Sequence, residues 1–127
     1  MAALFKRSET AKERAGRIDF EDMLALTVKL LGTDPSVASE VHDRYRWFSV
    51  DEYQDTNPLQ QALLDGWLGG REDLAVVGDE DQTIYTFTGA TSDYLVRFGE
   101  RYPTARTVRL ETNYRSTQPT RRAPHAA

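Results

Sequence analysis

This chain contains no cysteine and no long hydrophobic run. Without a thiol it can form neither a disulfide nor a thiolate metal site. A membrane-spanning helix needs about 20 consecutive apolar residues, and the sequence has no such stretch. Its opening residues, MAALFKRSET, also lack the apolar core of a signal peptide. We therefore expect a cytoplasmic protein without a membrane partner.

Length and charge narrow the possibilities further. The 127 residues allow one domain at most, with 39% hydrophobic residues available for its core. The net charge of −4 is not typical of a nucleic-acid binder, but it is unevenly distributed. Residues 1–46 carry 8 basic and 8 acidic side chains, residues 47–100 carry 2 and 11, and residues 101–127 carry 6 and 1. The acidic middle block suits a bound divalent cation, although a solvated acidic face is the more common reason for such a block.

Hydrophobic spacing and capping signals predict alternating helices and strands after residue 18. Helices are expected at 20–32, 35–45, 58–68 and 91–102, and strands at 46–50, 74–78 and 105–110. Asp19 and Asn57 are expected to cap two of the helices, while Gly32 and Gly69 end them. This order predicts an α/β fold in which helices flank a parallel sheet.

Each predicted strand is followed by a polar segment. DEYQD follows the first strand, GDEDQTIY the second and ETNYRS the third. Ligands of open parallel sheets bind beyond the carboxyl ends of the strands. The three exits therefore predict a site at one edge of the sheet, with Asp51, Gln82 and Arg115 brought together.

Asp51 and Glu52 place two carboxylates directly after a buried strand. Like charges this close repel one another unless a cation lies between them. In nucleotide hydrolysis, one carboxylate holds Mg²⁺ and its neighbour orients the attacking water. We assign these roles to Asp51 and Glu52 respectively, although Asp-Glu pairs are also common in solvated turns.

The other two exits offer side chains for phosphates and bases. Gln82 has a neutral amide that can bind a terminal phosphate and respond to its loss. Tyr85 and Phe87 alternate with polar residues, as stacking platforms for single strands do, although their spacing alone favours a place in the core. In NYRS, Arg115 can neutralise a phosphoryl transition state and Tyr114 can stack on a nucleobase. An Asn-Tyr-Arg-Ser sequence on its own is more often just a loop.

Three segments carry a resemblance to a known family. VDEYQDTN, VVGDEDQTIYTFTGA and RLETNYRSTQP, in this order and at these separations, closely resemble motifs of the UvrD/Rep/PcrA family of superfamily 1 DNA helicases. The earlier IDFEDML resembles the stretch that precedes the Asp-Glu strand in that family. The resemblance extends from about Ile18 to Gln118. It implies a partial RecA-like fold of the P-loop NTPase type, and ATP-driven movement 3′ to 5′ along one strand with unwinding of duplex DNA.

The resemblance also implies a role for each matching residue. Asp51 and Glu52 match the metal carboxylate and catalytic base of the Walker B pair. Gln82 matches the glutamine that senses the γ-phosphate of ATP and couples hydrolysis to the DNA site.

The remaining matches concern the two substrates. Tyr85 and Phe87 match a segment whose aromatic residues contact single-stranded DNA. Tyr114 matches the residue that packs on adenine, and Arg115 matches the arginine that reaches the γ-phosphate.

The sequence departs from the family pattern in several ways. Thr88 stands where many relatives have arginine, and Phe87 stands where several have tryptophan. No G-x-x-x-x-G-K-[ST] loop is present, and none of the three lysines follows a glycine. A second motor domain is also missing, and residues 119–127 do not continue the family's helix.

These departures predict a fragment of the first motor domain that is inactive by itself. We expect an N-terminal helical segment at 1–17, the partial RecA-like ATP-binding domain at 18–118 and an irregular basic tail at 119–127. Two alternatives remain: a non-catalytic remnant that binds single-stranded DNA or a partner protein, and a structural α/β module with vestigial strand exits.

Overall fold

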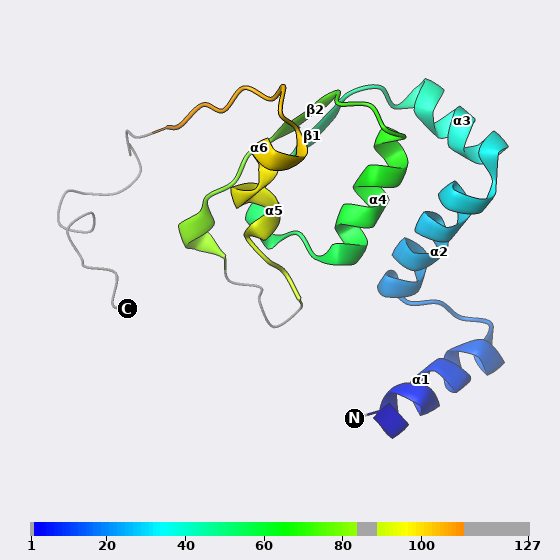
Figure 1. Cartoon of the computed structure of the whole chain (residues 1–127). Coiled ribbons are helices and arrows are strands. Elements are labelled where there is room, and N and C mark those ends of the chain that lie inside the picture. Colours follow the sequence, from blue (N-terminus) through cyan, green and yellow to red (C-terminus); the bar gives the residue numbers. More distant parts are fainter. Residues whose placement is uncertain (1, 84–88, 111–127) are drawn as a thin grey trace.

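The protein is described by a computed structural model, which covers residues 2–83 and 89–110, with side chains described from residue 6 onward. Within those ranges it combines helices with a small parallel sheet (Figure 1), which confirms the predicted α/β class. The helices are α1 (Ala2–Ala15), α2 (Phe20–Thr33), α3 (Pro35–Arg44), α4 (Pro58–Leu68), α5 (Asp93–Val96) and α6 (Phe98–Arg101). The strands are β1 (Phe48–Val50) and β2 (Leu74–Val76), and two short 3₁₀ turns are η1 (Tyr53–Asp55) and η2 (Glu80–Gln82).

Helix α2 begins at the predicted cap. The Asp19 carboxylate accepts a hydrogen bond from the N–H of Asp22 at 2.9 Å, and the Asp22 carboxylate accepts one from the N–H of Asp19 at 3.0 Å. This reciprocal pair satisfies two backbone donors that the first turn leaves open. The helix ends at Thr33, one residue beyond the predicted stop at Gly32.

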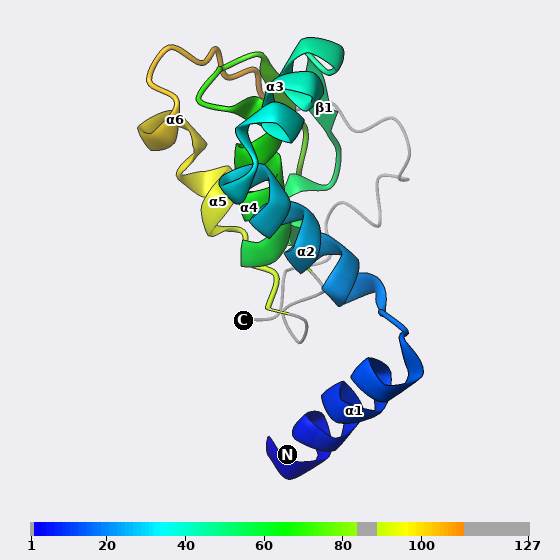
Figure 2. The same cartoon turned by 90° about the vertical axis from the view of Figure 1, so that its right-hand side faces the viewer.

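Helix α4 also has the predicted ends. Asn57 and Gln60 form a second reciprocal cap at its start, and Gly69 closes it with a φ of 59°. A Cβ at Gly69 would lie 2.3 Å from the ring of His42 in α3, so glycine is needed here for space as well as for conformation. Figures 1 and 2 show α2 alongside α4, and the two helices are in contact.

The core lies between one face of the sheet and the helices. In the parallel register Phe48 is opposite Leu74 and Val50 is opposite Val76. Side chains two apart along a strand share a face, and these four pack against Tyr53, Leu64 and Leu68, with Tyr94, Leu95 and Phe98 closing the cluster. Ser49 and Ala75, on the opposite face, are exposed. The predicted parallel pairing of the first two strands is therefore confirmed.

Two sequence expectations need correction. The predicted third strand at 105–110 is wrong: these residues form no strand, and Val108 and Leu110 are exposed. Alternating apolar residues form a strand only where a neighbour completes the hydrogen-bond ladder, and neither β1 nor β2 pairs with this segment. The predicted helix at 91–102 is divided at Arg97 into α5 and α6. Gly99, a poor helix former, follows that break by two residues.

Helix α1 projects away from the rest of the described structure (Figures 1 and 2). An ion-pair cluster joins it to the start of α2. The ammonium of Lys12 lies 2.7 Å from carboxylate oxygens of Glu9, Asp19 and Asp22. One cation therefore balances charge from both helices.

Candidate functional site

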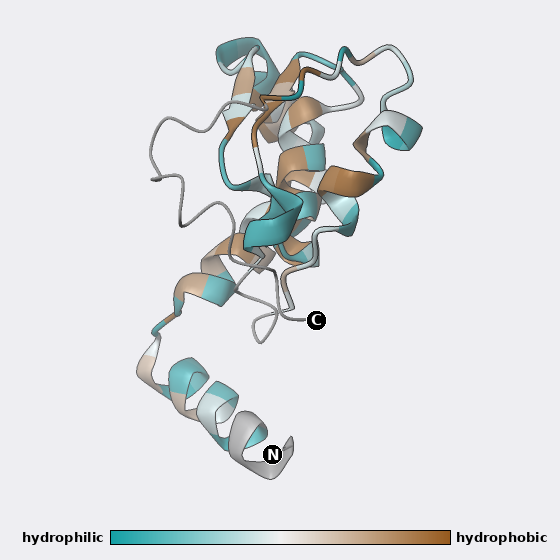
Figure 3. Ribbon diagram, turned by 90° about the vertical axis from the view of Figure 1, so that its left-hand side faces the viewer, coloured by the Kyte–Doolittle hydropathy of each residue, from teal (hydrophilic) through white to brown (hydrophobic). Residues whose placement is uncertain are grey.

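Asp51 and Gln82 both lie beyond the carboxyl ends of the sheet. Asp51 directly follows the last residue of β1, and Gln82 ends the η2 turn that follows β2. Because the strands are parallel, these two exits open at the same end of the sheet. Both side chains are exposed. Figure 3, viewed from the side of η2, shows this turn as a hydrophilic stretch.

Glu52 adopts a strained backbone conformation. Its φ of 51° and ψ of 40° are left-handed, which is unfavourable for a residue with a side chain. Its own N–H donates to Asp51 Oδ1 at 2.9 Å, and its carbonyl accepts from the N–H of Asp55 at 2.9 Å. The next N–H, of Tyr53, donates to Val77 O at 3.0 Å. These bonds hold a sharp turn that leaves the Glu52 side chain at the surface.

A buried amide connects Glu52 to the second strand exit. Gln54 is 1% exposed. Its Nε2 donates to Glu52 Oε2 at 2.7 Å, and its Oε1 accepts from the N–H of Asp79 at 3.0 Å. Both ends of the amide are therefore satisfied, as burial requires.

Asp79 extends this connection to Gln82. One oxygen of its carboxylate accepts from Gln82 Nε2 at 2.5 Å, and the other accepts from the N–H of Asp81 at 3.1 Å. Glu52, Gln54, Asp79 and Gln82 thus form a continuous set of hydrogen bonds. We call these four residues the exit network, because they join the exits of β1 and β2.

The polar surface beside Asp51 and Glu52 is hollowed. These two residues border a surface pocket whose walls also include Asp55, Asn57 and Trp67. The Trp67 ring is stacked on Phe48, with ring centroids 5.9 Å apart. The pocket therefore combines three carboxylates with an adjoining aromatic wall.

A second polar network, which runs from the core to the surface, supports the turn from behind. The hydroxyl of Tyr53, which is fully buried, donates to Gln61 Oε1 at 2.6 Å. Gln61 Nε2 donates to Asp65 Oδ1 at 2.9 Å, and Arg101 lies 2.6 Å from the same oxygen. Burial raises the pKa of Tyr53 to about 12, so its hydroxyl stays protonated and remains a donor near neutral pH.

Asp51 is suited to hold Mg²⁺. One of its oxygens is occupied by the N–H of Glu52, which orients the carboxylate and leaves the other oxygen to bind a cation. Carboxylate oxygen is the ligand that Mg²⁺ prefers, and one or two carboxylates suffice when substrate phosphates supply further ligands. The residues present therefore fit this ion.

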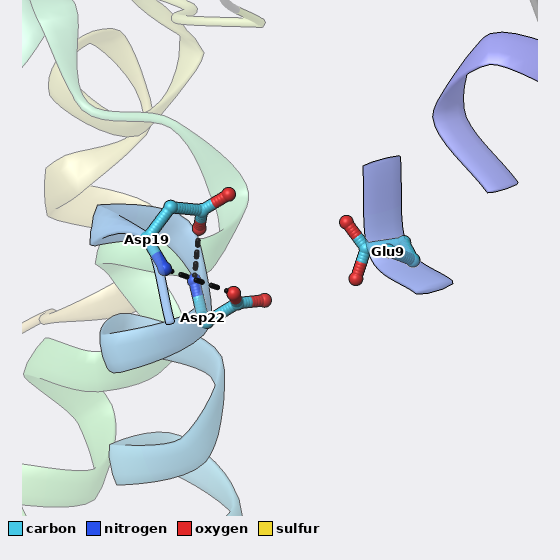
Figure 4. A group of neighbouring side chains, drawn as sticks. All are labelled: Glu9, Asp19 and Asp22. Atoms are coloured by element: carbon cyan, nitrogen blue, oxygen red, sulfur yellow. Dashed lines mark hydrogen bonds between the residues drawn. The ribbon is translucent and has the colours of Figure 1, made fainter. Parts of the chain in front are cut away.

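Another acidic cluster is occupied by a side chain. In the described ranges, Glu9, Asp19 and Asp22 are the group whose carboxylates lie close enough together to share a metal. Figure 4 shows the latter two at the first turn of α2, with Glu9 facing them from α1. The Lys12 ammonium lies 2.7 Å from all three, so it takes the position a cation would need. Its hydrogen bond holds the pKa of Asp19 below the ordinary value.

The remaining predicted site residues, Tyr85, Phe87, Tyr114 and Arg115, lie outside the described residues, so their roles stay predictions.

Sequence reasoning assigned no role to Gln54 or Asp79. Two signals point to them: a glutamine two residues after the predicted base, and a glycine, Gly78, at the end of the second predicted strand. Glycine at such a position often marks a close approach of two segments.

Comparison with known proteins identifies relatives along most of the chain. Residues 1–103 match the family described as UvrD/REP helicase N-terminal domain, and this match includes α1. The chain is 51% identical over 120 residues to the ATP-dependent DNA helicase UvrD2 of Mycobacterium tuberculosis, covering 92% of this chain and 17% of the relative. It is 38% identical over 118 residues to the ATP-dependent DNA helicase PcrA of Leuconostoc citreum, covering 93% and 16%. It is 34% identical over 116 residues to a putative ATP-dependent DNA helicase, YjcD, of Bacillus subtilis, covering 91% and 15%.

The relatives are much longer than this chain. The chain spans about a sixth of the length of the curated relatives it matches. Across residues 2–83 and 89–110, no helix has the length and apolar character needed to cross a membrane. The family match spans the first two of the three segments quoted above, and the family resemblance predicted from the sequence is confirmed: this chain belongs to the UvrD/REP helicase family, through its N-terminal domain.

Proposed function

We propose that this chain supplies the water-activating part of the ATP site in a UvrD-type DNA helicase. The observation that carries the proposal is the exit network, in which hydrogen bonds join Glu52 to Gln82 across the ends of two parallel strands. A base for hydrolysis and a phosphate-sensing amide must respond to each other if ATP turnover is to drive movement. A direct physical connection between the two supports these roles.

The two carboxylates of the pair have different tasks in this proposal. Asp51 would hold Mg²⁺, which offsets the charge of the ATP phosphates when it is bound. Glu52 accepts a hydrogen bond from Gln54 at Oε2, which leaves Oε1 to orient the attacking water. The left-handed turn at Glu52 keeps its carboxylate at the border of the surface pocket.

The other predicted residues complete the site by family resemblance. Gln82 would sense the γ-phosphate, Tyr114 would pack on adenine and Arg115 would reach the γ-phosphate. Tyr85 and Phe87 would contact single-stranded DNA. Residues 18–118 would then form part of a RecA-like domain.

In this proposal, the loop that binds the ATP phosphates lies outside this chain. The sequence has no G-x-x-x-x-G-K-[ST] loop, whose backbone amides and lysine normally hold the β- and γ-phosphates. The curated relatives are several times longer than this chain. We propose that the chain functions as a fragment of a longer helicase that provides the loop and the second motor domain.

A chimera tests the proposal. In Mycobacterium tuberculosis UvrD2, the aligned segment is replaced by the matching part of this chain; we call the product the UvrD2 chimera. DNA-stimulated ATP hydrolysis and ATP binding are measured for the chimera and for its Glu52→Gln variant. We expect the variant to lose turnover while it still binds ATP, because the amide keeps the size of the carboxylate but cannot act as a base.

The control is Glu40→Gln, the same substitution at an exposed position in α3. It should leave turnover unchanged. Turnover that survives Glu52→Gln would reject the role of this residue as the base. A folded chimera that binds single-stranded DNA but hydrolyses no ATP would instead favour a non-catalytic binding module.

A further inference from the structure

Gln54 is more deeply buried than any other member of the exit network. It is 1% exposed, and it belongs to the η1 turn between Glu52 and the first turn of α4. Burying a primary amide is unfavourable unless donor and acceptor ends are both paired. Here the donor end meets a carboxylate and the acceptor end meets a backbone N–H, so the amide has one favourable orientation.

Gly78, at the exit of β2, leaves space for the Gln54 amide. A Cβ at Gly78 would lie 2.6 Å from Gln54 Oε1 and 3.0 Å from Leu95 Cδ2. A side chain at position 78 would therefore push the amide away from the N–H of Asp79. Glycine at this position permits the second strand exit to approach Gln54.

Movement of the η2 turn would change these bonds. The Asp79 N–H binds Gln54, while the Asp79 carboxylate binds Gln82 and the N–H of Asp81. A shift of Gln82 therefore acts on the same residue that positions the Gln54 amide. That amide in turn holds Oε2 of Glu52 at 2.7 Å.

We propose that Gln54 is a positioning residue that orients the carboxylate of Glu52 and transmits movement of the η2 turn to it. This proposal rests on the proposed function, in which Glu52 orients the attacking water and Gln82 senses phosphate. Gln54 itself touches neither water nor nucleotide in this account. It acts through the angle and the hydrogen bonding of the Glu52 carboxylate.

The test uses Gln54→Met in the UvrD2 chimera. Methionine has nearly the length of glutamine but forms neither of the two hydrogen bonds. We expect the kcat of DNA-stimulated ATP hydrolysis to fall about 10–100-fold, as for other residues that orient a catalytic group, with little change in the KM for ATP. Gln54→Leu, which also removes both hydrogen bonds but adds no charge beside Glu52, should lower kcat as well. It keeps the test decisive if the methionine variant does not fold.

The chain contains a matched control. Gln61 is 3% exposed, and its amide binds Tyr53 and Asp65 rather than Glu52. Gln61→Met therefore also removes a buried amide beside the same turn. It should lower the melting temperature, but because its amide does not touch Glu52, its loss of kcat should be much smaller than that of Gln54→Met. An equal loss of kcat in both variants would mean a general loss of packing and would overturn the proposal.

Double variants test the transmission. If Gln54 joins Gln82 to Glu52, then Gln54→Met should lower kcat by a smaller factor in a Gln82→Leu background than in the unmodified chimera. Losses that simply multiply would overturn the transmitting role, and full kcat in Gln54→Met would overturn the positioning role. Failure of the proposed function gives a different result, because turnover would then survive Glu52→Gln.

Discussion

The hydroxyl of Tyr53 donates a 2.6 Å hydrogen bond to Oε1 of Gln61, and both side chains are buried. Tyr53 follows directly on the strained residue Glu52, whereas Gln61 lies on the inner face of α4. The bond therefore holds the turn of the candidate site against the main core helix. This contact and the exit network lead to separate predictions.

Removing the Tyr53 hydroxyl should destabilise the fold. Tyr53→Phe leaves the buried oxygen of Gln61 without this donor, which should lower the free energy of unfolding by about 1–3 kcal/mol. Urea denaturation of the purified chain measures the change. Tyr53→Phe combined with Gln61→Leu should cost less than the two single substitutions added together, because neither polar group is then left unpaired. An unchanged urea midpoint for Tyr53→Phe would contradict the prediction.

The same hydroxyl should make stability sensitive to alkaline pH. Burial raises the pKa of Tyr53 from 10.0 to about 12, so the folded state holds this proton more tightly than the unfolded state. The resulting contribution is complete below pH 10 and is lost as the pH rises through about 12. Unfolding measured across this range should show a loss of stability in the unmodified chain. The loss should be smaller in Tyr53→Phe, and equal slopes would contradict the prediction.

Lys12 should control the titration of Asp19. Its hydrogen bond is the main reason that the pKa of Asp19 lies below the ordinary value of 3.8. The contribution of this pair to stability is therefore present above that value and is lost as the pH falls through the lowered pKa. Lys12→Gln should move the pKa of Asp19 upward, as followed by NMR titration. Lys29→Gln, at an exposed position in α2, should leave it unchanged.

The chain by itself should not turn over ATP. It has no phosphate-binding loop of the G-x-x-x-x-G-K-[ST] type, so the β- and γ-phosphates lose most of their usual contacts. Phosphate release with Mg²⁺ and single-stranded DNA should stay at background. DNA-stimulated hydrolysis that disappears in Glu52→Gln would prove this expectation wrong.

Tyr85 and Phe87 either stack on the bases of single-stranded DNA or belong to the core. Measuring DNA binding and stability on the same variants distinguishes the two roles. If they stack on bases, each alanine substitution in the UvrD2 chimera should weaken single-strand binding by about 1–3 kcal/mol per base. If Phe87 instead belongs to the core, Phe87→Ala should cost roughly 3–5 kcal/mol of stability. For the chain alone, single-strand binding is compared between Phe87→Ala and a variant that lacks residues 119–127. Binding that ignores Phe87→Ala but disappears with this basic segment would assign the affinity to the segment.

Residue type and short-range spacing predicted the parts of the fold that depend on residues close together in the sequence. The caps at Asp19 and Asn57 were predictable because each hydrogen bond joins residues three apart in the sequence. The end of α4 at Gly69 was predictable because glycine adopts the left-handed conformation without steric cost. The absence of a strand at 105–110 was not predictable, because the apolar alternation of this segment carries no information about whether a partner strand is present.

The sequence by itself determined the family, the helix caps and the polar composition of the strand exits. These are properties of residue type and spacing along the chain. Only the tertiary structure decided that Gln54 connects the exits, because its two partners differ in distance along the sequence. Glu52 is two residues away, but Asp79 is 25 residues away, and the parallel pairing of β1 and β2 brings it to the buried amide. A hydrogen bond between distant segments depends on how the sheet and the core pack, which no short pattern of residues encodes.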